Sequence, residues 1–162
     1  MSATTEDLIK FLRGLRQVRE YTTESISEDI VNDMLEVGLW SGTSGNKQLT
    51  EVIVVRDRGV LEKLGGWGTK PAATSAVSFV ICSKNERIGM DEGRLGERLM
   101  LAARAHGLGA AFDGDDPLEL QGIVRHRLPV AVRILQILRI ANRASDAHCR
   151  AHLWPRQMRD QL

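Results

Sequence analysis

The chain has 162 residues, of which 43% are hydrophobic and 27% are charged, and its formal net charge is +1. This length suits one domain with a sizeable hydrophobic core, and the 4% aromatic content means that the core must be mainly aliphatic. The longest clearly apolar run, residues 76–82, is much shorter than the roughly 20 residues of a spanning helix, so a transmembrane protein is excluded.

Two further features indicate the compartment. The N-terminus is polar and acidic and does not resemble a signal peptide. Cys82 and Cys149 are too few for a disulfide framework. We therefore expect a reduced, cytoplasmic protein that does not bind membranes.

The charge is unevenly distributed along the chain. Residues 1–120 carry 14 basic and 19 acidic side chains, a net charge of −5, whereas residues 121–162 carry eight arginines and two aspartates, a net charge of +6. An arginine-rich segment can bind phosphate, nucleic acid or an acidic protein surface. It can equally cover the acidic part of its own chain or of a second subunit.

The first part of the chain is typical of two helices followed by a loop and a strand. Thr5 and Ser27 are suitable N-caps, and apolar residues follow each of them at helical spacing. The inner stripe of the second helix is expected to consist of Ile30, Met34, Leu35 and Val37. Glycine and serine in residues 41–46 favour a shaped loop, and the β-branched residues 52–55 predict a buried strand.

The middle of the chain predicts two helices and a strand. A short helix is expected near residues 60–64, followed by a strand at 76–82. A longer helix should cover about residues 91–106, with Gly107 as its C-cap. The side chains expected to face inward from that helix are Leu95, Leu99, Ala102 and Ala103.

The last part of the chain completes the fold class. Pro117 opens another short helix, and residues 130–140 predict a strand with apolar side chains on both faces. Helices and a few strands in this order indicate an α+β fold in a single domain, residues 1–162.

Three familiar kinds of site have little support. The glycines of residues 107–114 follow a helix, whereas a Rossmann turn follows a strand. His148, Cys149 and His152 have no visible fourth ligand, so we expect no metal site. No Ser–His–Asp or Cys–His arrangement can be recognised.

Two polar patterns remain as candidates. Arg13, Arg16 and Arg19 recur every three residues, which indicates either a solvated helix face or a phosphate clamp. Asn46 and Gln48 place two side-chain amides on an irregular segment, and amides can donate and accept hydrogen bonds at the mixed edge of a heterocycle. Each pattern alone is also compatible with an ordinary polar surface.

Taken in order, these segments resemble the FMN-dependent nitroreductase family. Residues 16–21, Arg-Gln-Val-Arg-Glu-Tyr, are similar to the family's Arg-Ser-x-Arg/Lys-x-Phe/Tyr opening. Residues 40–48, Trp-Ser-Gly-Thr-Ser-Gly-Asn-Lys-Gln, are similar to its Pro-Ser-x-x-Asn-x-Gln-Pro-Trp loop. The strand at 52–57 follows where the family has its first core strand, and residues 91–109 resemble its central helix and glycine turn.

The resemblance implies a nitroreductase-like α+β fold, with a central, mostly antiparallel sheet flanked by helices, in an intertwined homodimer with FMN bound at two interfacial sites. The implied flavin-binding residues are Arg16, Gln17, Arg19, Asn46, Gln48 and Gly114. The first three would hold the phosphate, the two amides would bind the ring or ribityl chain, and the backbone near the glycine would lie beside the redox nitrogen. No catalytic side chain is implied, because the flavin carries the chemistry.

The implied activity is hydride transfer from NAD(P)H to FMN, followed by electron transfer to a small acceptor such as a nitro compound or a quinone. Residues 141–162 would form a C-terminal arm, in which Arg156 and Arg159 are candidate phosphate ligands. The chain departs from the family pattern at Leu15, where many members have an arginine, and at 49–50, where Leu-Thr replaces Pro-Trp.

These departures leave two alternatives. The first is a non-catalytic or weak flavin-binding module of the same fold, with a regulatory role. The second is nucleic-acid binding through the arginine-rich C-terminus. Trp154 is the only aromatic residue of that segment, and stacking on bases usually needs several, so we do not expect a nucleic-acid partner.

Overall fold

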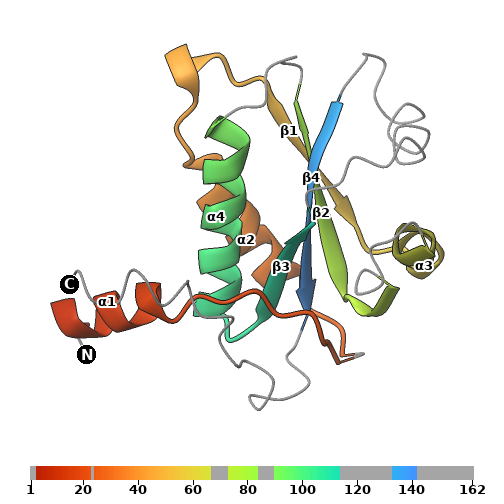
Figure 1. Cartoon of the computed structure of the whole chain (residues 1–162), viewed down its shortest axis with the longest axis horizontal. Helices are drawn as coiled ribbons and strands as arrows, with labels where there is room; N and C mark the ends of the chain where they lie inside the picture. The colour runs from red at the N-terminus through yellow and green to blue at the C-terminus, as the bar shows by residue number, and fades with distance from the viewer. Residues whose placement is uncertain (1–2, 23, 67–72, 84–89, 114–132, 142–162) are drawn as a thin grey trace, which may run out of the picture.

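The computed structural model describes residues 3–22, 24–66, 73–83, 90–113 and 133–141 (Figure 1). In chain order, the elements of these residues are α1 (Thr5–Arg13), α2 (Glu28–Leu39), the short 3-10 helix η1 (Ser44–Asn46), β1 (Thr50–Val55), α3 (Arg58–Gly66), β2 (Val77–Ser83), α4 (Met90–Ala105), β3 (Gly109–Asp113) and β4 (Arg133–Ala141).

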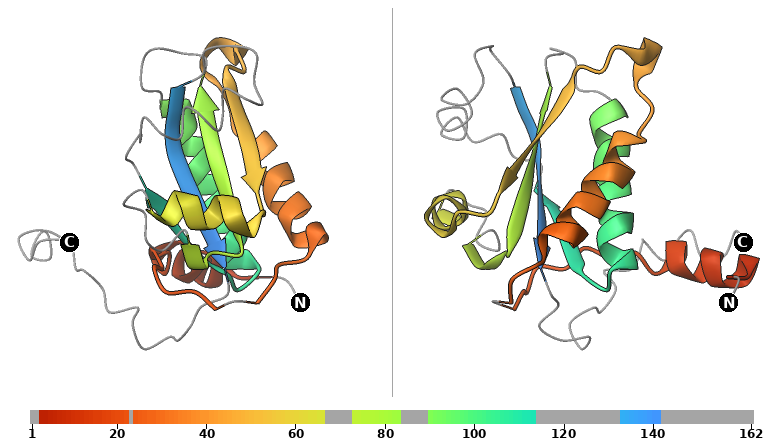
Figure 2. Two further views of the ribbon diagram at one scale, coloured as in Figure 1. Left: turned by 90° about the vertical axis from the view of Figure 1, so that its right-hand side faces the viewer. Right: turned by 180° about the vertical axis from the view of Figure 1, so that it is seen from behind.

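The four strands form one antiparallel sheet in the order β1-β2-β4-β3. Every residue of β2 is buried, as expected for a central strand that is covered on both faces. Helices α2 and α4 lie against one face of the sheet, and α3 lies on the other side (Figure 2). The predicted α+β fold, with a central antiparallel sheet flanked by helices, is therefore confirmed.

The core lies between the sheet and the α2–α4 pair. The four residues predicted to face inward from the long helix, Leu95, Leu99, Ala102 and Ala103, are all buried there. β2 contributes Phe79 and Ile81 to the same cluster, and α2 contributes Met34. A small residue in α4 lets β3 approach: a Cβ atom built on Gly96 would lie 2.0 Å from the ring of Phe112.

Local signals fix the helix ends. α1 is capped by Thr4, one residue before the predicted cap, because Thr4 and Asp7 form a reciprocal capping box. Hydrogen bonds from Thr4 lower the pKa of Asp7 from its usual value. Ser27 caps α2 as predicted. Gly107 ends α4 as predicted, with a φ of 74° that few other residues adopt easily.

Two predictions about the elements were wrong. Met34 of the predicted stripe is buried, and Ile30 and Leu35 pack against the core, but Val37 is exposed, because α2 faces the core with Val31, Met34 and Gly38. Gly38 allows close contact with Leu95 and Leu99 of α4, which fixes the rotation of α2. β3 was not predicted, since its Gly-Ala-Ala start lacks the β-branched residues that mark a strand.

Two predicted features cannot be compared with the structure. The short helix expected after Pro117 lies outside the described residues. β4 ends at Ala141, the first residue of the expected C-terminal arm, and the rest of that arm also lies outside them.

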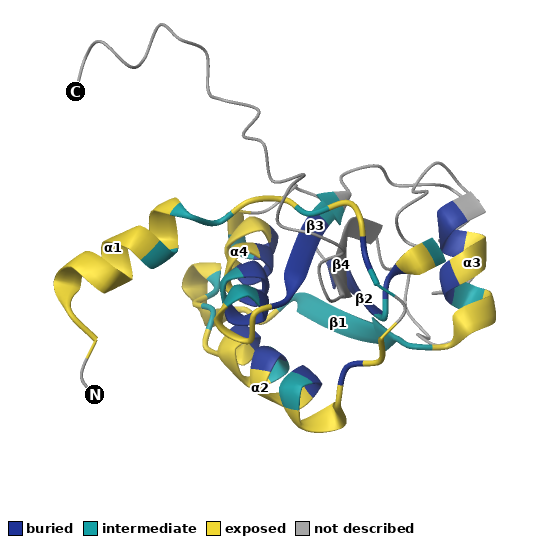
Figure 3. Cartoon of the chain, turned by 90° about the horizontal axis from the view of Figure 1, so that it is seen from below, coloured by how far each residue is buried: buried dark blue, intermediate teal, exposed yellow. Residues whose placement is uncertain are grey.

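α1 extends away from the body of the chain and buries none of its residues (Figure 3). Its apolar side chains Leu8, Ile9 and Leu12 are exposed. Within the described ranges, no helix is long and apolar enough to cross a membrane.

Candidate functional site

The two predicted amides lie in a loop at the N-terminal end of α4. This amide loop, residues 43–48, contains Asn46 and Gln48 and precedes β1. The backbone N–H of Ser44 donates a hydrogen bond of 2.7 Å to Oδ2 of Asp91, in the first turn of α4.

The basic segment, residues 16–19, lies at the other end of α4. It contains the predicted phosphate ligands Arg16, Gln17 and Arg19. Gln17 forms an isolated parallel bridge with Ala110, which follows the end of α4. Because a helix rises about 1.5 Å per residue, the 16 residues of α4 separate the two groups by roughly 20 Å. One chain therefore does not bring them together, and Gly114 lies outside the described residues.

The backbone of the amide loop is strained. Gly45, Asn46 and Gln48 have φ angles of 60°, 53° and 50°, in the left-handed region. Glycine and asparagine adopt this region readily and glutamine rarely does, so the strain lies at Gln48. Thr43 holds this conformation, because its carbonyl accepts from the Asn46 N–H at 3.0 Å and its Oγ1 accepts from the Gln48 N–H at 3.2 Å. Strain of this kind is concentrated at ligand-binding sites.

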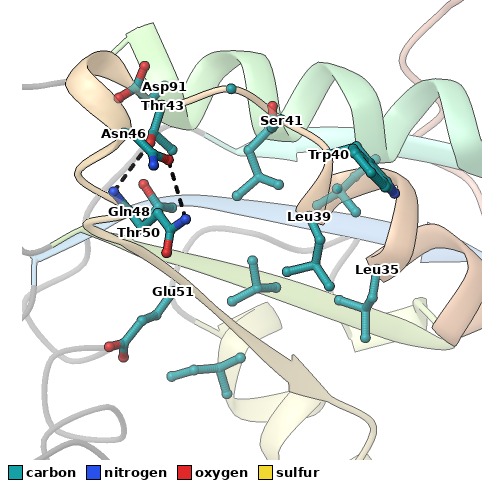
Figure 4. Close-up of a pocket in the computed structure, with 16 residues that line it drawn as sticks. Leu35, Leu39, Trp40, Ser41, Thr43, Asn46, Gln48, Thr50, Glu51 and Asp91 are labelled. Atoms are coloured by element: carbon teal, nitrogen blue, oxygen red, sulfur yellow. Dashed lines mark hydrogen bonds between the residues drawn. The ribbon is translucent and has the colours of Figure 1, made fainter.

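The strained loop places the two amides side by side (Figure 4). Nε2 of Gln48 donates to Oδ1 of Asn46 at 3.4 Å. Among the described residues, this contact leaves the Asn46 amide nitrogen as a donor and the Gln48 carbonyl as an acceptor. The pair can therefore bind a ligand edge that carries both an acceptor and a donor.

The amides lie at one end of a pocket of about 800 Å³, between the end of α2, the start of β1 and α4 (Figure 4). Its apolar lining includes Leu35, Leu39, Trp40, Val52, Leu95 and Leu99. Volume, apolar walls and a few polar groups are typical of a cofactor site. Leu39 and Trp40 are 84% and 76% exposed, so the rim of the pocket is itself apolar and open to a partner.

The charged side chains that line the pocket are acidic, and the basic residues beside it are Lys47 of the amide loop and Arg94, whose guanidinium lies near Gly42. Glu51 and Asp91 line it, and Glu92, only 3% exposed, accepts from the hydroxyl of Thr50 at 3.1 Å. These carboxylates would repel a phosphate. The pocket is therefore suited to a neutral ring, and the basic segment to an anion.

The basic segment is anchored to the sheet and keeps one arginine exposed. The Val18 N–H donates to the Ala110 carbonyl at 2.8 Å. Nη1 of Arg16 donates to the carbonyls of Arg13 and Leu15, which caps the end of α1. Arg19 is exposed, and in the described part of the chain its side chain has no hydrogen-bond or ion-pair partner. Of the two arginines, Arg19 is the one available to an anion in this conformation.

Two other reactive side chains of the described residues, Cys82 and His106, have structural surroundings. Burial, with a smaller contribution from Glu51, raises the pKa of Cys82 to about 12, so its thiol stays protonated. Nε2 of His106 lies 3.3 Å from Oδ2 of Asp33 and links α4 to α2. The described residues contain no cluster of metal-ligating side chains, and His148, Cys149 and His152 lie outside them.

Sequence reasoning missed the residues that hold the two groups. Asp91 contacts the amide loop across 47 positions in the sequence, and Arg104 contacts Gly14 across 90. Neither residue was among the predicted site residues. An acidic residue at the start of a helix and a basic residue at its end are common, because they interact favourably with the helix dipole. The contacts of Asp91 and Arg104 with distant segments depend on the fold.

Comparisons with known proteins agree with this architecture. Residues 12–78 match the model of the nitroreductase family, a range that contains both groups of described candidates. A protein of Archaeoglobus fulgidus named "Putative NADH dehydrogenase/NAD(P)H nitroreductase" is 29% identical over 123 residues, which cover 70% of this chain and 71% of that protein.

Solved structures show the same fold. A Bacteroides thetaiotaomicron protein with the same name has a TM-score of 0.80 at 20% identity, covering 96% of this chain and 97% of that one. An FMN-dependent nitroreductase of Clostridium difficile has a TM-score of 0.75 at 22% identity, covering 85% and 88%. Sequence match and fold lead to one conclusion: residues 12–78 are similar to the nitroreductase family, and the chain has the nitroreductase fold.

Proposed function

We propose that the chain is an FMN-dependent oxidoreductase that takes hydride from NAD(P)H and passes electrons to a small acceptor, such as a nitro compound or a quinone. The family and the names of its relatives support a general oxidoreductase role. The observation that carries the finer proposal is the pair of amides, Asn46 and Gln48, held in a strained loop at the end of an apolar pocket. Bound FMN would supply the hydride acceptance and the electron release.

The chain's own residues would bind and orient the cofactor. The Asn46 amide nitrogen and the Gln48 carbonyl would hydrogen-bond to the polar edge of the ring or to the ribityl chain. Arg19 and Gln17 would hold the phosphate. Arg16 would join them by giving up its hydrogen bonds to the carbonyls of Arg13 and Leu15 and donating to the phosphate instead. An anion is a stronger acceptor than a neutral carbonyl. The backbone near Gly114 would complete the ring site.

We propose further that the functional unit is a homodimer. The amide loop and the basic segment lie at opposite ends of α4, so a site that contains both is best built from two copies. The apolar face of α1 and the rim formed by Leu39 and Trp40 are exposed surfaces that a second copy would cover. The unit would be a single cytoplasmic domain, with residues 141–162 as an arm.

One observation favours the alternative of a weak or non-catalytic flavin-binding module. Leu15, which replaces a phosphate-binding arginine of many family members, is partly buried against the core. It cannot contribute to an anion site, and one lost charge-assisted bond weakens binding by roughly tenfold or more. The nucleic-acid alternative rests on residues 121–162, of which the structure describes only β4.

Titration of the purified protein with FMN, followed by its fluorescence and visible spectrum, tests the proposal. We expect saturable binding, bleaching of the flavin band by NADH or NADPH without oxygen, and its return when a nitro compound or a quinone is added. Bound flavin that neither nucleotide reduces would favour the non-catalytic module. Protein that does not bind FMN would refute the proposal.

A further inference from the structure

The basic segment is held between two anchors. At its far end, the N–H of Val18 donates to the carbonyl of Ala110 in β3. At its near end, Nη1 of Arg104 in the last turn of α4 donates to the carbonyl of Gly14 at 2.6 Å. Arg16 and Gln17 lie between these anchors, so their backbone position depends on both.

Arg104 is packed tightly into its position. Its guanidinium lies 5.3 Å from the ring centroid of Phe11, within cation–π range. Its Nε is buried and has no hydrogen-bond partner among the described residues. A guanidinium with one donor left unpaired is poorly optimised for stability alone.

Gly14 leaves room for this arginine. A Cβ atom built on Gly14 would lie 2.2 Å from Nη2 of Arg104. The φ of Gly14 is −87°, which other residues also adopt, so contact with the arginine, not backbone strain, is what a larger side chain would disturb. Because the clashing atom is the far end of a flexible side chain, an alanine here would displace the guanidinium.

We propose that Arg104 is a positioning residue for flavin phosphate: it fixes the end of α1 so that the basic segment is ordered before the anion binds. The inference rests on the proposed function, in which this segment holds the phosphate. Arg104 itself would not touch the phosphate, because its guanidinium is committed to Gly14 and Phe11.

Loss of Arg104 would remove the anchor at Gly14 and leave the segment attached through its bridge to Ala110 and the packing of Leu15 against the core. FMN binding would then have to order the freed backbone. The entropy cost of ordering one residue raises the dissociation constant about tenfold. Only ligands that use the segment would be affected. Riboflavin lacks the phosphate, so its affinity should not depend on Arg104.

The test compares dissociation constants for FMN and riboflavin in the full-length protein. We expect Arg104→Ala to raise the constant for FMN about tenfold and to leave that for riboflavin unchanged. Arg104→Lys, which keeps one donor, should recover part of the loss. Arg98→Ala removes the same charge from an exposed position of α4 and should bind both ligands as the unchanged protein does.

Gly14→Ala provides an independent test, because it displaces the guanidinium and leaves residue 104 unchanged. It should lower the preference for FMN over riboflavin as Arg104→Ala does. It also keeps the test decisive if Arg104→Ala does not fold.

The outcomes separate the inference from the proposed function. If Arg19→Ala reduces the preference for FMN and the variants at positions 14 and 104 do not, the inference is overturned and the proposed function stands. If both flavins weaken equally while the melting temperature falls, Arg104 is only structural and the inference is overturned. If the unchanged protein does not prefer FMN to riboflavin, both fail.

Discussion

The backbone N–H of Ser44 donates to the carboxylate of Asp91 at 2.7 Å, which joins the amide loop to the first turn of α4. At the opposite end of the same helix, Arg104 contacts Gly14. One helix, packed through its inner face against the core, therefore determines where both groups of candidate residues lie. Helices packed into a core are the rigid elements on which binding sites are best built.

We expect Asp91→Ala to loosen the amide loop, because the Ser44 N–H loses its acceptor. FMN affinity should fall about threefold to tenfold, in line with the loss of one hydrogen bond to a charged group at a partly exposed position. Asp91→Asn keeps an oxygen in the same place and is the matched control. Equal affinity for all three proteins would show that the contact does not support binding.

Variants of the amides should separate binding from stability. Asn46→Ala and Gln48→Ala remove ligand contacts that are exposed in the described structure, so they should lower FMN affinity and the rate of flavin reduction. Gln48→Gly is the sharper variant, since glycine adopts a φ of 50° freely. Relief of strain offsets the larger entropy of the unfolded chain, so the flavin-free protein should keep its unfolding free energy within about 1 kcal/mol.

Denaturant unfolding of the flavin-free protein and FMN titration measure the two quantities. A loss of stability as large as the loss of binding would make the amides structural residues. That result would remove the main support for the proposed ring contacts.

Most of the fold could be predicted from the sequence, because its signals are local. The caps at Ser27 and Gly107 and the inward stripe of α4 depend on spacing within one element. The rotation of α2 could not be predicted, since Gly38 acts through contact with another helix. β3 escaped prediction because its pairing with β4 determines its conformation more than its residue types do.

The candidate site could be predicted only in part. Residue type identified the amides and arginines as binding groups, but not their left-handed backbone or their separation along α4. The orientation of Arg16 could not be predicted either. The same arginine at this position can cap the end of its own helix or bind an anion, and the sequence does not distinguish the two. Geometry of this kind depends on tertiary contacts.

Arg19→Ala should weaken FMN roughly ten- to hundred-fold, the cost of one charge-assisted hydrogen bond to phosphate. Its side chain is exposed outside any apolar stripe, so the melting temperature of the flavin-free protein should hardly change. Riboflavin affinity should also stay the same. Gel filtration that returns stoichiometric FMN at unchanged affinity would show that the phosphate assignment is wrong.

Gly96→Ala should destabilise the protein, because the added methyl group would overlap the ring of Phe112. Overpacking of this kind costs about 1–3 kcal/mol of unfolding free energy. Gly93 lies on an exposed part of the same helix, and a Cβ there would meet nothing within 4 Å. Gly93→Ala should therefore stabilise the helix by about 0.5–1 kcal/mol, and opposite signs for the two variants would confirm the contact between α4 and β3.

The exposed face of α1 leads to the last prediction, on assembly. Leu8 and Leu12 are 55% and 45% exposed in the single chain, so replacing both with serine would cost a monomer little. If a second copy covers this face, the double variant should shift the protein towards monomer in light scattering and lower its melting temperature.

The melting temperature of the unchanged protein should also rise with protein concentration, because association stabilises the folded state by mass action. FMN should be lost together with the dimer, since each proposed site combines the amide loop of one copy with the basic segment of the other. Lys10→Ala changes an exposed charged residue of the same helix and should alter none of these properties. A double variant that remains dimeric and binds FMN would show that α1 does not contribute to the interface.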